Sequence, residues 1–136
     1  MTEKDLIKTA KAAAKMSYSP YSNCRVGAAL LCVNGMVYTG CNIENVSYGL
    51  TMCAERTAIY KMVSSGCTKF VAIAVSAGEK PTDSAPCGAC RQVISEFCED
   101  INETPIIECG QNGTYYMEPV ISFYPRPFMK FEPNND

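Results

Sequence analysis

The 136-residue sequence contains no histidine, and this absence excludes several kinds of catalytic and metal site. A Ser-His-Asp triad, a Cys-His nucleophile pair, an HExxH zinc site and a two-His-one-carboxylate iron site each need a residue that this chain lacks. Any metal chemistry must therefore use thiolates and carboxylates.

The sequence also lacks a strong charge of either sign and a long apolar run. Twelve Lys and Arg against fourteen Asp and Glu give a net charge of −2, and there is no basic cluster, which argues against a nucleic acid polymer as partner. No window approaches the roughly 20 apolar residues of a membrane span. The N-terminus carries charges where a signal peptide has its apolar region. We expect a cytoplasmic protein with no membrane partner.

The length and composition indicate one globular domain over residues 1–136, with an ordinary hydrophobic fraction of 47%. Cysteine is the residue that stands out, with nine copies. An odd cysteine count without a secretory signal points to reduced thiols and metal ligation rather than to a disulfide framework.

The hydrophobic periodicity predicts an alternation of helices and short strands. The expected elements are a helix from a cap at Thr2 to about Met16, strands at 26–33 and 36–42, a helix at 53–65, a strand at 69–77, a helix at 87–99, and two short strands around Asn112-Gly113. Asn34-Gly35 predicts a type I′ turn in the first hairpin. This order favours a three-layer α/β/α sandwich with a mixed sheet of about five strands. The segment from residue 120 onward shows no clear periodicity.

Three cysteines are expected at the starts of two helices. Cys53 begins the second helix, and Cys87 and Cys90 lie on one face of the third, in line with Ile94 and Phe97. Helix N-termini lower the pKa of a cysteine and so favour thiolates. Three thiolates meeting at one edge of the sheet would form a zinc site with one ligand missing.

The missing ligand separates two kinds of zinc site. Structural zinc has four protein ligands, whereas catalytic zinc keeps one position for water. Glu55 follows Cys53 by two residues, so its carboxylate can reach that water and move its proton without binding the metal. The alternatives are a structural site completed by Cys41 or Cys98, and a chain in which all nine cysteines only pack in the core.

The segments "CAERTA" and "APCGACRQVISEF" resemble the zinc-dependent cytidine deaminases, in the small homotetrameric form that has only cysteine ligands. The resemblance extends through "YSPYSNCRVGAALL" and "GCNIENVSYGL" and so covers most of the chain. It implies that Cys53, Cys87 and Cys90 bind one Zn²⁺ per subunit. Zinc-bound hydroxide would attack C4 of the cytosine, with Glu55 as the proton shuttle. The implied reaction converts cytidine and 2′-deoxycytidine to uridine and 2′-deoxyuridine in pyrimidine salvage.

The same resemblance implies further contacts. Asn42 and Glu44 would bind the ribose 3′-hydroxyl, and the backbone N–H of Ala54 would bind the cytosine O2. Arg56 would place a positive charge close to the ligand sulfurs and offset the net charge of −1 that three thiolates leave on the zinc; the alternative is an ordinary charge on the helix surface. The alternation of side chains in an extended strand is consistent with the contact of Asn42 and Glu44 with one hydroxyl, because residues 42 and 44 point to the same face.

The resemblance further implies a homotetramer whose active sites are completed by neighbouring subunits. Tyr48 would reach the 5′ end of a nucleoside in a neighbouring subunit, and Phe128 of "FYPRPF" would cover a neighbour's site, with Phe123 as the less favoured choice. Cys24 departs from the family, which usually has a base-stacking Phe at this position. Loss of stacking costs about 1–3 kcal/mol unless another ring supplies it.

Three other interpretations remain open. Blasticidin deaminases share the zinc motif, but they resemble this chain less at Glu44. Deaminases of polynucleotides need a basic channel, which a net charge of −2 does not provide. A non-catalytic, zinc-stabilised binding module is the alternative from another class, and it predicts that Glu55→Gln leaves every function intact.

Overall fold

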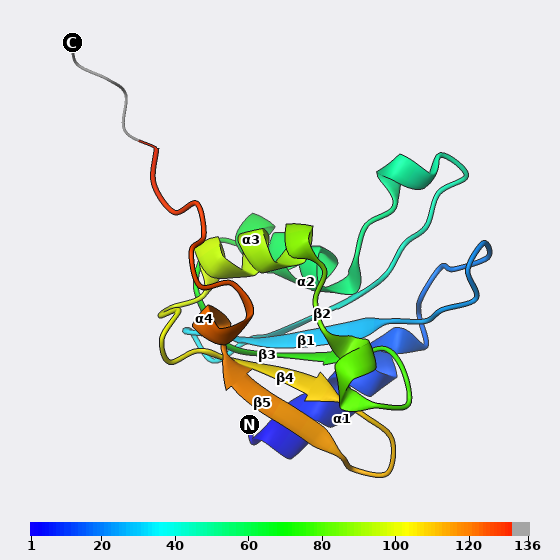
Figure 1. Cartoon of the computed structure of the whole chain (residues 1–136), viewed down its shortest axis with the longest axis horizontal. Coiled ribbons are helices and arrows are strands. Elements are labelled where there is room, and N and C mark those ends of the chain that lie inside the picture. Colours follow the sequence, from blue (N-terminus) through cyan, green and yellow to red (C-terminus); the bar gives the residue numbers. More distant parts are fainter. Residues whose placement is uncertain (132–136) are drawn as a thin grey trace.

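The computed structural model describes residues 1–131 and places a five-stranded sheet between two layers of helices (Figure 1). The strands are β1 (Gly27–Cys32), β2 (Val37–Cys41), β3 (Phe70–Ser76), β4 (Pro105–Cys109) and β5 (Tyr115–Pro119). The helices are α1 (Glu3–Ala14), α2 (Ala54–Ser64), α3 (Gly88–Phe97) and α4 (Val120–Phe123), with short 3₁₀ helices η1 (Tyr48–Leu50) and η2 (Pro81–Ser84).

The three-layer α/β/α architecture predicted from the sequence is confirmed. Helix α1 lies on one face of the sheet, and α2 and α3 lie on the other (Figure 1). Neighbouring residues of one strand face different layers: Ile73 of β3 packs with α2 and α3, and Ala74 packs with α1. Burial on both faces explains why this strand reads as a continuous apolar run.

The sheet topology brings the starts of α2 and α3 to the same end of the molecule. The strand order is β2-β1-β3-β4-β5, in which β1 is antiparallel to both β2 and β3. Strands β2 and β3 therefore run in the same direction, and each is followed by one of these helices. Strands β3 and β4 are parallel, so the sheet is mixed as expected.

A close approach of α2 to the sheet fixes the position of this helix. A methyl group at Gly40 of β2 would lie 2.4 Å from the Ala58 nitrogen and 2.5 Å from the Ala54 oxygen. Only glycine leaves room for backbone this close. The first turn of α2 is thereby held against the end of β2.

The two hairpin turns differ from each other, and the turn type expected for the first is wrong. A type I′ turn needs positive φ at both central residues. Gly35 has φ +90°, but Asn34 keeps a negative φ, and the Gly35 N–H donates to the Cys32 carbonyl over 2.9 Å. In the β4–β5 hairpin, Asn112 (φ +58°) and Gly113 (φ +77°) do meet the type I′ requirement.

A disulfide joins Cys32 at the end of β1 to Cys67, just after α2. This pair corrects the expectation that the cysteines outside the metal site are reduced. The two residues are 35 positions apart in sequence, and the packing of α2 on the sheet brings their Cα atoms to 6.9 Å. The other seven cysteines are free.

Helix α4 and the two 3₁₀ helices were not expected from the sequence, because each is only three or four residues long and shows no periodicity. Within residues 1–131, no helix combines the length and apolar character needed to cross a membrane.

Candidate active site

The sulfur atoms of Cys53, Cys87 and Cys90 all lie within 4.8 Å of one another. Cys53 is the N-cap of α2 and Cys87 is the N-cap of α3, while Cys90 lies in the first turn of α3. Cys53 is half-buried, Cys87 is exposed and Cys90 is buried. The structure thus brings together the three cysteines that the sequence singled out, and their spacing suits a metal ion.

Among the described residues, this group contains three members and no fourth ligand. Cys98 is buried at the other end of α3, where its thiol contacts the Ser95 carbonyl over 3.5 Å, and Cys41 lies on β2. Neither of these alternatives completes a closed structural site. Three thiols from two helix starts fit a zinc site that keeps one position open.

Glu55 lies in the first turn of α2 and is only 4% exposed. It lines a cavity of about 210 Å³ together with Cys53 and Cys87. Burial raises the pKa of Glu55 to about 7, so its carboxyl group can hold or release a proton near neutral pH. A carboxyl group with a raised pKa therefore lies in the same cavity as two of the thiols.

Arg56 supplies a positive charge next to the thiols. Its Nη2 atom donates a hydrogen bond to the Cys53 sulfur over 3.2 Å. Hydrogen bonding with Cys90, followed by that with Arg56 and Cys87, holds the pKa of Cys53 below that of an ordinary thiol. The Arg56 contact therefore favours the thiolate that a metal needs.

The side chain of Asn42 lines the same cavity but already has hydrogen-bond partners. Its Oδ1 accepts from the Val26 N–H over 2.9 Å and from the Ser17 hydroxyl, and its Nδ2 donates to the Cys24 carbonyl over 2.8 Å. Asn42 thus connects β2 to the loop of residues 15–26.

Glu44 holds the same loop at a second point. Its Oε1 accepts from the backbone N–H groups of Tyr21 (3.0 Å) and Ser22 (3.1 Å), and its Oε2 accepts from the Ser22 hydroxyl. These hydrogen bonds with Ser22 lower the pKa of Glu44. Glu44 lines a second hollow, which includes Tyr21 and Tyr48, and Thr51 lines both this hollow and the Glu55 cavity. The two hollows therefore adjoin.

The remaining predicted residues occupy different environments. Ala54 is buried and lines the Glu55 cavity. Tyr48 is 73% exposed, and its ring lies 5.7 Å from that of Tyr21. Phe128 is 62% exposed and is not part of the Glu55 cavity of its own chain. Cys24 is exposed and does not line that cavity either.

Sequence reasoning missed the segment of residues 83–85, which forms one wall of the Glu55 cavity. Ser84 is buried there: its hydroxyl accepts from the Ala77 N–H over 2.9 Å and donates to the Cys109 carbonyl over 2.7 Å. The position of this segment directly before Pro86 and Cys87 is the signal that could have identified it.

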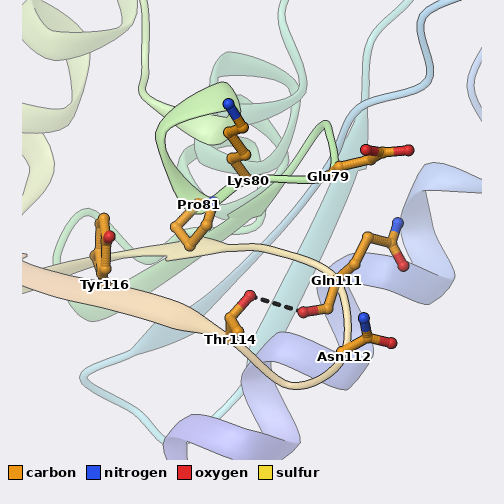
Figure 2. Close-up of a pocket in the computed structure, with 7 residues that line it drawn as sticks. All are labelled: Glu79, Lys80, Pro81, Gln111, Asn112, Thr114 and Tyr116. Atoms are coloured by element: carbon orange, nitrogen blue, oxygen red, sulfur yellow. Dashed lines mark hydrogen bonds between the residues drawn. The ribbon is translucent and has the colours of Figure 1, made fainter.

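A larger hollow of about 670 Å³ lies elsewhere, between the turn at Glu79 and Lys80 and the β4–β5 turn (Figure 2). Figure 2 shows the Thr114 hydroxyl donating to the Gln111 carbonyl, a bond of 2.7 Å. This hollow is not lined by cysteine. Size alone therefore does not identify the site, whereas the chemistry of the cysteine group does.

Comparison with known proteins agrees with this arrangement. The family model of the cytidine and deoxycytidylate deaminase zinc-binding region matches residues 1–107. A cytidine deaminase from Sporosarcina psychrophila is 45% identical over 130 residues, covering 96% of this chain and 93% of the relative. A cytidine deaminase from Halalkalibacterium halodurans is 55% identical over 98 residues, covering 72% of this chain and 74% of that relative.

Solved structures show the same relationship. The crystal structure of a cytidine deaminase from Burkholderia pseudomallei has a TM-score of 0.84 at 41% identity, covering 94% of this chain and all of that one. The crystal structure of a cytidine deaminase from Mycobacterium tuberculosis has a TM-score of 0.77 at 35% identity, covering 94% of this chain and 98% of that one. Together with the cysteine group and its neighbouring carboxylate, these matches show that the chain belongs to the family of zinc-dependent cytidine and deoxycytidylate deaminases.

Proposed function

We propose that this protein hydrolyses cytidine and 2′-deoxycytidine to uridine and 2′-deoxyuridine, with Cys53, Cys87 and Cys90 as the ligands of one zinc ion per chain. The observation that carries the proposal is a group of three cysteine sulfurs, two of which, those of Cys53 and Cys87, share a cavity with the buried carboxyl group of Glu55. The names of the relatives support the choice of cytidine as substrate.

The donor set fits zinc. Thiolates are ligands that zinc accepts readily, and three protein ligands with one open position are typical of its catalytic sites. When bound, zinc supplies Lewis acidity that activates a water molecule near neutral pH. The hydrogen bond from Arg56 to the Cys53 sulfur tempers the negative charge of the thiolates.

Glu55 is proposed to move the protons of the reaction. The reaction forms a C4–O bond with oxygen from water, breaks the C4–N bond and releases ammonia. Glu55 takes a proton from the water and delivers it to N3 of the ring. It then takes the second proton from the hydroxyl group now on C4 and delivers it to the departing nitrogen, so that the C4–O bond becomes a carbonyl and ammonia leaves. Its burial beside Cys53 keeps the carboxyl group away from bulk solvent, where competing proton exchange would occur.

The two adjoining hollows suggest how the nucleoside lies. The base would occupy the Glu55 cavity, where the Ala54 N–H at the start of α2 can bind the cytosine O2. The sugar would lie toward Glu44 in the second hollow, and Asn42, which lines the Glu55 cavity, would bind the 3′-hydroxyl together with Glu44. Hydrogen bonds to the 3′-hydroxyl do not distinguish a 2′-hydroxyl from a 2′-hydrogen, so both cytidine and 2′-deoxycytidine are expected as substrates.

The chain is proposed to act as a single domain over residues 1–136, in a cytoplasmic homotetramer that serves pyrimidine salvage. The exposed rings of Tyr48 and Phe128 support a role outside their own chain, because neither is buried where it stands. In the tetramer, each would contribute to the nucleoside site of a neighbouring subunit.

The test follows the ultraviolet absorbance of cytidine mixed with purified protein, beside the variants Glu55→Gln and Glu103→Gln. Glu103 is an exposed glutamate outside the site and provides the matched control. We expect Glu55→Gln to keep about one zinc per chain and to lose at least about 100-fold in kcat, since general acid–base catalysis typically contributes that much or more. If the zinc-loaded wild type leaves both nucleosides unchanged, the proposed substrates are wrong. An active Glu55→Gln would overturn the proton shuttle.

A further inference from the structure

Two consecutive side chains of α3 bind the segment that follows β5. Gln92 Nε2 donates to the Phe128 carbonyl over 2.6 Å, and the Phe128 N–H donates to Gln92 Oε1 over 3.2 Å. Arg91 Nη1 donates to the Phe123 carbonyl over 2.9 Å. One glutamine amide thus satisfies both backbone groups of Phe128, as a neighbouring strand would in a sheet.

This contact fixes the backbone of Phe128 and leaves its ring free. Phe128 is 62% exposed, whereas Phe123 is half-buried and its ring lies 5.6 Å from the Arg91 guanidinium. The two phenylalanines are therefore held in opposite ways: Phe123 packs onto its own chain, and Phe128 is presented outward. Packing of the tail alone does not explain why Phe128 is exposed, because burying its ring would gain more hydrophobic free energy.

Helix α3 also sets the position of the thiols. Arg91 Nε donates to the carbonyl of Pro86, directly before Cys87, over 2.8 Å. Cys90 lies one residue before Arg91 on the same helix. The segment carrying Phe128 is therefore held by the helix that carries two of the three cysteines, so movement of that helix would shift them together.

We propose that Gln92 is a positioning residue: by holding the Phe128 backbone, it aims the exposed ring into the nucleoside site of a neighbouring subunit. Gln92 does not touch the nucleoside and acts only through Phe128. Because a ring held in place loses less freedom on binding, Gln92 raises affinity for the nucleoside without changing the chemical step. This role rests on the proposed function, whereas the contact itself does not.

The contact is tested without reference to activity by amide hydrogen exchange. The full chain is labelled with ¹⁵N-phenylalanine, which gives one backbone signal for each of the five phenylalanines. In the wild type, the Phe128 amide should exchange more slowly than in Gln92→Met, a side chain of similar length that neither donates nor accepts strongly. Gln111→Met, on the exposed β4–β5 turn, is the matched control and should leave Phe128 protected. Equal exchange in the wild type and Gln92→Met would overturn the contact.

The positioning role is tested by steady-state kinetics on cytidine. Gln92→Met should raise KM by about three- to tenfold, the range expected for one or two lost hydrogen bonds, while kcat and zinc content stay within about twofold. Phe128→Ala should raise KM at least as much. The double variant should be no worse than Phe128→Ala, because Gln92 has nothing left to position.

Several outcomes would overturn the role. They are an unchanged KM in Gln92→Met, a kcat that falls while KM stays constant, additive effects in the double variant, and dissociation of the assembly by light scattering. A wild type that is inactive on cytidine would instead refute the proposed function and the role that depends on it. The exchange experiment would still decide whether Gln92 holds Phe128.

Discussion

The Nη2 atom of Arg56 lies 3.2 Å from the sulfur of Cys53, so helix α2 carries in its first turn a cation for the thiol at its start. The Nε atom of the same guanidinium is buried without a hydrogen-bond partner. A buried donor atom without a partner is costly, and the contact of the same half-buried guanidinium with the Cys53 sulfur offsets part of this cost. Arg56 is therefore more than a surface charge.

Replacing Arg56 by Gln should weaken the metal site. Without the hydrogen bond, the Cys53 thiolate is less stabilised and its pKa rises, so we expect a loss of about 10- to 100-fold in zinc affinity or in kcat. Zinc titration and steady-state kinetics measure the two effects. Lys61→Gln, on the exposed end of the same helix, should change neither. Equal zinc affinity and kcat in Arg56→Gln and the wild type would contradict this role.

Zinc content should depend on the three clustered cysteines and not on the others. Cys87→Ser is expected to lose most of its zinc, measured by elemental analysis after dialysis, because it removes one of three ligands. Cys41→Ser and Cys98→Ala should retain about one zinc per chain. Loss of zinc from either control would restore the closed structural site as the better description.

The disulfide between Cys32 and Cys67 should be detectable as missing thiols. After denaturation and zinc chelation, the unreduced chain should show seven reactive thiols and the reduced chain nine. Reduction should lower the free energy of unfolding by about 2–4 kcal/mol, the typical value for a loop of this length. In Cys32→Ala/Cys67→Ala, reductant should have no such effect. Nine thiols before reduction would show that the pair is open.

The start of α1 should make stability depend on pH. Thr2 and Asp5 form a reciprocal capping box, and the backbone hydrogen bond from Thr2 lowers the pKa of Asp5. Because the folded pKa lies below the unfolded one, the ionised Asp5 stabilises the fold at neutral pH, and this contribution is lost as pH falls through the folded pKa. Urea unfolding should therefore show a deficit for Asp5→Asn at pH 7 that shrinks below about pH 4. A deficit that is constant across this range would refute the ionised cap.

Much of the fold could be predicted because its main elements have strong local patterns. The run at 69–77 became β3 with a difference of one residue at each end, since burial on both faces leaves a continuous apolar signal. The sequence predicts a type I′ turn at Asn34-Gly35, whereas, of the two hairpin turns, the structure has positive φ at both central residues only at Asn112-Gly113. The dipeptide permits this turn, and the pairing of the flanking strands decides where it forms.

The cysteine group and Glu55 were predicted because their spacing reflects two helix starts. The partners of Asn42 and Glu44 were not predicted, because they belong to the loop of residues 15–26, and no local pattern reveals a contact across about 20 residues. The same reason explains why the disulfide of Cys32 was missed. Local sequence identifies groups with chemistry, and tertiary packing decides which of them are already engaged.

Helix α2 is anchored at both ends. Its start holds Cys53, which a metal ion would tie to α3, and just past its end Cys67 is bonded to β1. A segment held in this way cannot open from either terminus by fraying, which is the usual route of local unfolding. The amides of α2 should therefore exchange only when the whole domain unfolds. Removing zinc or reducing the disulfide should each free one end, and fraying should then begin from that end alone.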